Sequence, residues 1–189
     1  MPSQNSEEVV PVLVDLKQSS HLERFTRELE LNWQLIHDEF FEIPGSLYMP
    51  WPWKFQYTGN WSVFGLFDRF GVTQKHVLER NRATCPMTVA ILHRFPMVAC
   101  AGFSILYPGT IIKPHRDDLY ARPLVRCHLP LTVPENCGIA FWAGDPPEWV
   151  EIRWAPGKCL AFNEHYEHKA WNLSKSPRVV LITDVADDV

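Results

Sequence analysis

The sequence predicts a mainly β protein with N-terminal helices, in which the strands form a double-stranded β-helix, also called a jelly roll. Before about residue 98, apolar residues recur at helical steps and aromatic residues cluster, whereas later short apolar runs alternate with turn residues. Strands at such regular spacing are typical of antiparallel sandwiches and barrels. Without a repeat or linker to divide the chain, we expect one domain over residues 1–189, with helical, aromatic-rich support over 1–98 and the β-helix core over 99–189.

Residues 20–41 carry apolar side chains at steps of three or four, which predicts an amphipathic helix with one buried face. Ser20 and Glu23 match a capping box at its start, and Pro44-Gly45 ends it.

The aromatic stretch over residues 48–55 contains Pro50 and Pro52, which disfavour a helix, so we expect an extended loop. Apolar residues alternate with other residues over 61–67 in a pattern that predicts a strand. Residues 86–95 are expected to form a short helix with Pro86 at its first position. The strands expected in the β-helix core cover residues 103–107, 110–113, 124–133, 139–142, 149–154, 159–162 and 179–185.

The composition is that of a folded soluble protein, with 46% hydrophobic and 21% charged residues. A net charge of -4 without a run of Lys and Arg argues against nucleic-acid or membrane-surface partners. The five cysteines include no C-x-x-C pair, so we expect reduced thiols rather than disulfides or a zinc knuckle. Residues 1–8 lack the features of a secretory signal, and the longest apolar stretch is too short to span a bilayer. These features predict a cytoplasmic protein.

The pattern with most chemical content is His115-x-Asp117 followed, far along the chain, by His168. Side chains two apart on a strand point the same way, so His115 and Asp117 can enter a barrel together, and a later strand can bring His168 to them. Two histidines and one carboxylate, with open coordination positions, favour iron(II). A structural zinc site would require a fourth protein ligand, and we see none.

Arg178 opens an apolar strand, where a planar guanidinium inside the roll would suit the carboxylate of a cosubstrate. Taken alone, His-x-Asp often occurs by chance and Arg178 reads as a surface charge. Only the combined spacing favours a site. His165 is a weaker substitute ligand at the rim.

The chain resembles the aspartyl/asparaginyl β-hydroxylase family of iron(II)- and 2-oxoglutarate-dependent oxygenases through residues 103–115, 126–129 and 157–168 and Arg178. The resemblance implies that His115 and His168 bind iron and that Arg178 pairs with the distal carboxylate of 2-oxoglutarate. It also implies that Ser104, Arg126 and His128 hold this cosubstrate; the alternatives are a buried strand hydroxyl for Ser104 and a polar network for the other two.

The resemblance has two departures. Asp117 supplies the carboxylate ligand that animal members acting on epidermal-growth-factor-like domains lack, as in bacterial relatives that act on lipid A or free amino acids. Gly102 and Leu124 stand where those animal enzymes use basic side chains to hold an acidic substrate. An acidic side chain is therefore not the expected target.

Together these features predict an iron(II)- and 2-oxoglutarate-dependent dioxygenase that uses O2 to hydroxylate an unactivated C–H bond, releasing succinate and CO2. We expect a small-molecule or amino-acid-derived substrate. Trp171, Trp51 and Trp53 are candidates for the substrate pocket, although Trp51 and Trp53 can equally cover the end of the roll. The alternatives are a cupin-like metal-dependent isomerase or lyase and a noncatalytic jelly roll that binds a ligand.

Overall fold

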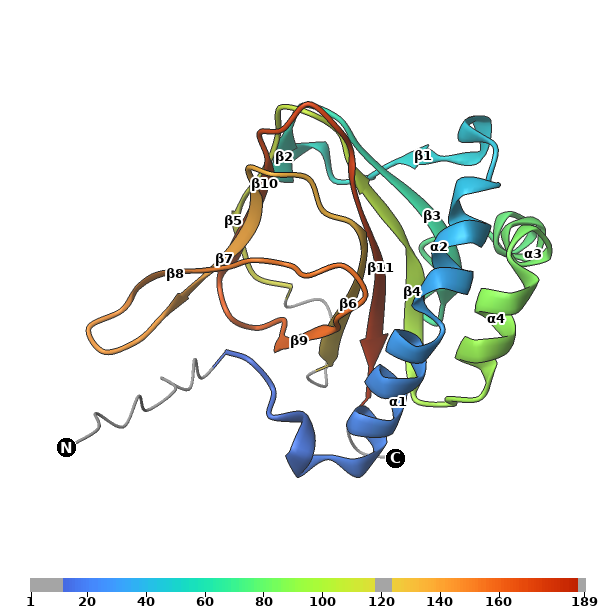
Figure 1. Ribbon diagram of the computed structural model, residues 1–189. Helices are drawn as coiled ribbons and strands as arrows, with labels where there is room; N and C mark the ends of the chain where they lie inside the picture. The colour runs from blue at the N-terminus through green and yellow to red at the C-terminus, as the bar shows by residue number, and fades with distance from the viewer. Residues whose placement is uncertain (1–11, 118–123, 187–189) are drawn as a thin grey trace.

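The computed structural model describes residues 12–117 and 124–186, and its strands form two antiparallel sheets that face each other (Figure 1). In sheet order, the six-stranded sheet contains β1 (Met49–Pro50), β3 (Trp61–Asp68), β4 (Val98–Leu106), β11 (Arg178–Val185), β6 (Val125–Thr132) and β9 (Leu160–Asn163). The five-stranded sheet contains β2 (Tyr57–Thr58), β5 (Thr110–His115), β10 (His168–Asn172), β7 (Cys137–Ala143) and β8 (Glu148–Ile152). This architecture confirms the predicted jelly roll.

The helices lie on the side of the six-stranded sheet that faces away from the five-stranded sheet (Figure 1). They are α1 (Ser20–Leu31), α2 (Trp33–Phe41), α3 (Lys75–Thr84) and α4 (Pro86–His93), with short 3-10 helices at Leu16–Gln18, Gly45–Leu47 and Lys54–Gln56. One apolar core joins the helices to this sheet, through residues such as Phe25 and Phe103. A second core lies between the sheets and includes Phe141 and Phe162.

Strand alternation places the charged and polar residues of β6 and β11 that were predicted for the site on the face opposite the helices. On β6, Cys127 and Leu129 belong to the core beneath the helices, so Arg126 and His128 face the five-stranded sheet. On β11, Val179 and Leu181 face the helices, so Arg178 faces the five-stranded sheet. The predicted cosubstrate residues on these strands therefore share the inner face.

The predicted helix over residues 20–41 is two helices, because the chain breaks at Asn32. The Asn32 side chain donates to the carbonyl oxygen of Glu28 at 2.8 Å, which competes with helix continuation. The predicted capping box is also wrong by one position. Ser19 is the N-cap and its hydroxyl accepts from the N–H of Leu22 at 3.4 Å, while Ser20 is already helical.

Other differences concern elements with weak local signals. The sequence does not predict helix α3, because the helix is largely polar and two of its side chains are buried, those of Leu78 and Asn81. Strand β4 begins at Val98, five residues before the predicted start. The expected strand at 61–67 and the helix beginning at Pro86 are confirmed.

Residues 1–8, which argue against a secretory signal, lie outside the described residues. Within the described part of the chain, no helix combines the length and the apolar character needed to cross a bilayer.

Candidate metal centre

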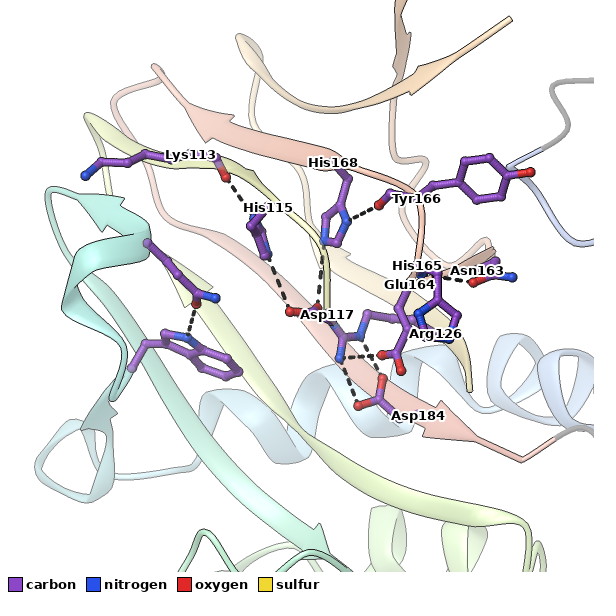
Figure 2. Close-up of polar contacts among 12 residues, drawn as sticks. Lys113, His115, Asp117, Arg126, Asn163, Glu164, His165, Tyr166, His168 and Asp184 are labelled. Atoms are coloured by element: carbon purple, nitrogen blue, oxygen red, sulfur yellow. Dashed lines mark hydrogen bonds and ion pairs between the residues drawn. The ribbon is translucent and has the colours of Figure 1, made fainter. Parts of the chain in front are cut away.

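The three predicted metal ligands converge between the two sheets. His115 is the last residue of β5 and His168 the first of β10, and the two are register partners. Asp117 follows β5 and is held by a bond from its N–H to the carbonyl oxygen of Glu164 at 3.2 Å. One ligand atom from each of the three side chains lies within 4.8 Å of the others. Figure 2 shows both imidazoles directed toward the Asp117 carboxylate.

Each histidine ring is oriented by the backbone carbonyl group of the residue two positions before it. Nδ1 of His115 lies 2.8 Å from the carbonyl oxygen of Lys113, and Nδ1 of His168 lies 2.9 Å from that of Tyr166. Since a carbonyl oxygen only accepts, each Nδ1 donates and each Nε2 keeps its lone pair in the neutral ring. Burial, followed by the neighbouring His115, lowers the pKa of His168 to about 4, so that ring is neutral at pH 7.

The donor set fits a three-ligand metal site. The Nε2 atoms of His115 and His168 lie 3.7 Å and 3.9 Å from different oxygens of Asp117. Among the described residues, no fourth His, Cys, Asp or Glu joins this group. Two imidazoles and one carboxylate on one side leave coordination positions for other molecules, as iron(II) oxygenases require.

Asp117 is tied to a buried network of charged side chains. Burial alone would raise the pKa of Asp117, but Arg126 and the two histidines lower it below its ordinary value. Arg126 donates to Asp117 from one guanidinium nitrogen and binds both oxygens of Asp184, at 2.7 Å and 3.0 Å. It also lies 3.1 Å from a carboxylate oxygen of Glu164. Arg126 thus contacts Asp117, a predicted metal ligand, together with two further carboxylates (Figure 2), and its role toward a cosubstrate stays a prediction.

We expect the Asp184→Asn variant to bind metal about tenfold more weakly, the lower end of the range for loss of an outer partner. The amide replaces one acceptor by a donor that faces the guanidinium, so Arg126 loses its bidentate partner and Asp117 its fixed orientation. Titration of the apo protein with Mn(II), followed by electron paramagnetic resonance, measures the affinity. Glu28→Gln is the control, because Glu28 pairs with Arg94 outside the site. If Asp184→Asn binds Mn(II) as tightly as the wild type, the network around Arg126 does not contribute to metal binding.

The predicted cosubstrate residues Arg178 and His128 form a second cluster on the inner face. Arg178 is 2% exposed, and among the described residues its Nε and Nη1 atoms have no hydrogen-bond partner. Nε2 of His128 is likewise buried, with no partner in the described part of the chain. Burial, and then the charge of Arg178, hold the pKa of His128 well below its ordinary value. The cluster therefore presents unsatisfied donors between the sheets.

Ser104 also lies on the inner face, where its hydroxyl accepts from the indole N–H of Trp61 at 2.9 Å. Ser104 pairs with Val180, two residues along β11 from Arg178. Trp51 stacks on Trp61 with ring centroids 4.1 Å apart, and Trp53 packs edge-on against Trp51. The two predicted pocket residues Trp51 and Trp53 are thus joined to the core through Trp61.

The structure does not bring Trp171 to the triad. On β10, His168, Ala170 and Asn172 are buried, whereas Trp171 alternates to the other face and is half-buried. Its ring lies over Gly138, where an added Cβ would come within 2.7 Å of it. Its position supports no role beside His168. His165, the substitute ligand, is also outside the group of converging ligand atoms.

Three residues of the site are not among the predicted ones, and the sequence marks two of them. Asp184 is the one acidic residue of β11, near the end of its apolar run, and Glu164 lies inside the stretch that carries the family resemblance. Trp154 reaches Arg178 and His128 from the segment between β8 and β9. Its place there depends on how the chain folds back, which local pattern does not reveal.

A family model described as "Aspartyl/Asparaginyl beta-hydroxylase" matches residues 30–188. The human protein of that name is 32% identical over 171 residues, covering 84% of this chain and 20% of its own length. "Ornithine lipid ester-linked acyl 2-hydroxylase" of Rhizobium tropici is 36% identical over 132 residues, covering 66% of this chain and 41% of that protein. The chain therefore spans less than half the length of these two relatives.

A solved structure supports the fold independently. A protein from Burkholderia pseudomallei described as an oxidoreductase of the 2OG-Fe(II) oxygenase family superposes with a TM-score of 0.55 at 13% sequence identity. The superposition covers 82% of this chain and 81% of that structure. At this level of identity the likeness concerns the arrangement of the strands.

Proposed function

Since the chain belongs to the aspartyl/asparaginyl β-hydroxylase family, we propose that it is an iron(II)- and 2-oxoglutarate-dependent dioxygenase that hydroxylates an unactivated C–H bond. Bound iron, with 2-oxoglutarate and O2, would supply the oxidation that yields succinate, CO2 and a hydroxylated product. His115, Asp117 and His168 would hold the metal. Their convergence within 4.8 Å supports this assignment.

The observation that most supports the proposal is the buried guanidinium of Arg178, which has no carboxylate partner among the described residues. Among the described residues, no carboxylate lies within ion-pair distance of its guanidinium, although the side chain is 2% exposed. Leaving a charge buried and unpaired costs on the order of several kcal/mol, which a ligand carboxylate would offset. Burial accordingly lowers the pKa of Arg178 to about 10, so it still carries its charge at pH 7.

The order of groups along the inner face supports a dicarboxylate such as 2-oxoglutarate. Asp184 pairs with Arg126 at the end of β11 near the triad, Ile182 pairs with His128, and Arg178 begins the strand. His128 thus lies between the metal ligands and Arg178. A molecule that contacts the metal with one end and Arg178 with the other would pass the His128 ring.

For the substrate we propose a small molecule or an amino acid, free or within a peptide. At Gly102 an added Cβ would come within 2.9 Å of the carbonyl oxygen of Phe64, so a basic side chain that could hold an acidic substrate has no room there. The name of the Rhizobium relative favours a second candidate, the acyl chain of a lipid. Mass spectrometry with amino acids, peptides and acyl lipids distinguishes them by a 2-oxoglutarate-dependent gain of one oxygen atom.

We expect anaerobic addition of iron(II) and 2-oxoglutarate to give a weak visible charge-transfer band, and subsequent air to give succinate. A cupin-like isomerase or lyase would bind the metal but produce no succinate. A noncatalytic jelly roll would take up no metal tightly. Absence of the band in folded protein that contains iron would overturn the proposal.

A further inference from the structure

Trp154 contacts both His128 and Arg178, two of the residues that we assign to the cosubstrate. It lies between β8 and β9, is 5% exposed and belongs to the core between the sheets. Its Nε1 atom is 3.2 Å from Nδ1 of His128. The Cζ atom of Arg178 lies 4.7 Å from the centre of its ring. One indole therefore touches an imidazole through its edge and a guanidinium through its face.

The hydrogen bond to Trp154 determines the tautomer of His128. An indole nitrogen only donates, so Nδ1 of His128 must accept and cannot carry a proton. The proton of the neutral ring is then on Nε2, which makes Nε2 a donor. That Nε2 atom is buried and has no partner within residues 12–117 and 124–186, so its N–H is available to an acceptor brought by a ligand.

The second contact acts on the charge of Arg178. A guanidinium over the face of an indole is attracted by the ring, most strongly where water is excluded. The ring provides some compensation for the buried charge before a ligand arrives, and it limits the positions that the guanidinium can take. The Nε and Nη1 atoms of Arg178 have no hydrogen-bond partner among the residues that the structure describes, and they can donate to the same ligand as His128.

We propose that Trp154 is a positioning residue that prepares His128 and Arg178 to donate together to one carboxylate-bearing cosubstrate. The proposal rests on the function inferred above. Trp154 would not touch the cosubstrate itself and would act through His128 and Arg178. If Trp154 only filled space, its ring would be needed but its N–H group would not. The Trp154→Phe variant distinguishes a space-filling role from a positioning role, because it keeps an aromatic face and removes the N–H donor.

The tautomer is tested without any cosubstrate. In protein labelled with 15N-histidine, long-range proton–nitrogen spectra identify which ring nitrogen carries the proton, and His128→Gln assigns the signal. We expect a protonated Nε2 in the wild type and a shifted Nδ1 resonance in Trp154→Phe. A proton on Nδ1 of the wild-type ring would overturn the proposal directly.

Binding of 2-oxoglutarate to the Mn(II)-loaded protein, measured by calorimetry, tests the consequence. Loss of one buried hydrogen bond predicts a dissociation constant about fivefold to tenfold higher for Trp154→Phe. Affinity for Mn(II) should stay within about twofold, since Trp154 touches no metal ligand in the described contacts. Trp33→Phe is the matched control, because its indole donates to the Pro130 carbonyl oxygen at 2.8 Å and supports the helices.

The outcomes separate this proposal from the proposed function. If the wild type binds no 2-oxoglutarate, the proposed function fails, and with it the role of Trp154 toward that cosubstrate. If the wild type binds and Trp154→Phe binds equally well, only the positioning role fails. Weaker binding by Trp154→Phe, with Trp33→Phe unchanged and the Nδ1 resonance shifted, supports both.

Discussion

Replacing Arg178 by leucine is expected to weaken 2-oxoglutarate binding by about two orders of magnitude or more, as for loss of one partner from a buried charge pair. The guanidinium is 2% exposed and has no carboxylate partner among the described residues, so nothing else identified there would replace it. Calorimetric titration of the Mn(II)-loaded variant measures the loss. Mn(II) binding itself should persist, because Arg178 is not among the residues that contact the triad.

The same variant should not lose stability. Leucine removes a buried charge that lacks a protein partner, and exchanging such a charge for an apolar side chain is often neutral or stabilising. We therefore expect the melting temperature of the apo protein to stay the same or rise. Arg153→Leu is the control, because the Arg153 side chain is 86% exposed. Unchanged 2-oxoglutarate affinity in Arg178→Leu would contradict our assignment, whatever its melting temperature.

The parts of the site that the sequence predicts are those that depend on local geometry. His115 and Asp117 are two residues apart, and such a pair can point to one side of an extended chain. The sequence also predicts strands β6, β7 and β11, because each is a short apolar run bounded by turn residues. For His168 the residues predict that a later strand can bring it to this pair, and the family resemblance adds that His115 and His168 bind the same metal.

The parts that the sequence does not predict depend on pairing between distant strands. Arg126 meets Asp184 because β6 and β11 run antiparallel in the register that places the two residues opposite each other. A shift by one residue would turn Asp184 toward the helices. Local pattern therefore indicates a charged residue on β6 without showing that its partners are carboxylates of the protein.

Trp171 shows how proximity in sequence misleads. Its position three residues after His168 in the sequence predicts that it borders the substrate pocket. Within a strand, however, an odd separation puts two side chains on opposite faces. Since β10 begins at His168 and includes Trp171, the indole lies over Gly138 on the face away from the triad. The sequence does not show that a strand begins at His168, and without that boundary the face on which Trp171 lies cannot be predicted.

Replacing His168 by alanine is expected to raise the dissociation constant for Mn(II) by more than about a hundredfold, beyond what loss of an outer partner costs. The change removes one of the three converging donor atoms. It leaves Asp117 in contact with Arg126, which then competes with the metal for the carboxylate. Electron paramagnetic resonance of Mn(II) measures affinity, and succinate release in the absence of substrate measures turnover.

His21→Ala is the matched control, because His21 is exposed on α1 and outside the converging group. It should retain wild-type values in both assays, whereas His168→Ala should lose metal affinity and succinate release together. The contrast with Arg178→Leu is informative, because that variant should keep the metal and lose the cosubstrate. If His168→Ala binds Mn(II) as the wild type does, the two imidazoles and Asp117 do not form a metal site. The proximity of their nitrogen and oxygen atoms would then reflect packing at the ends of β5 and β10.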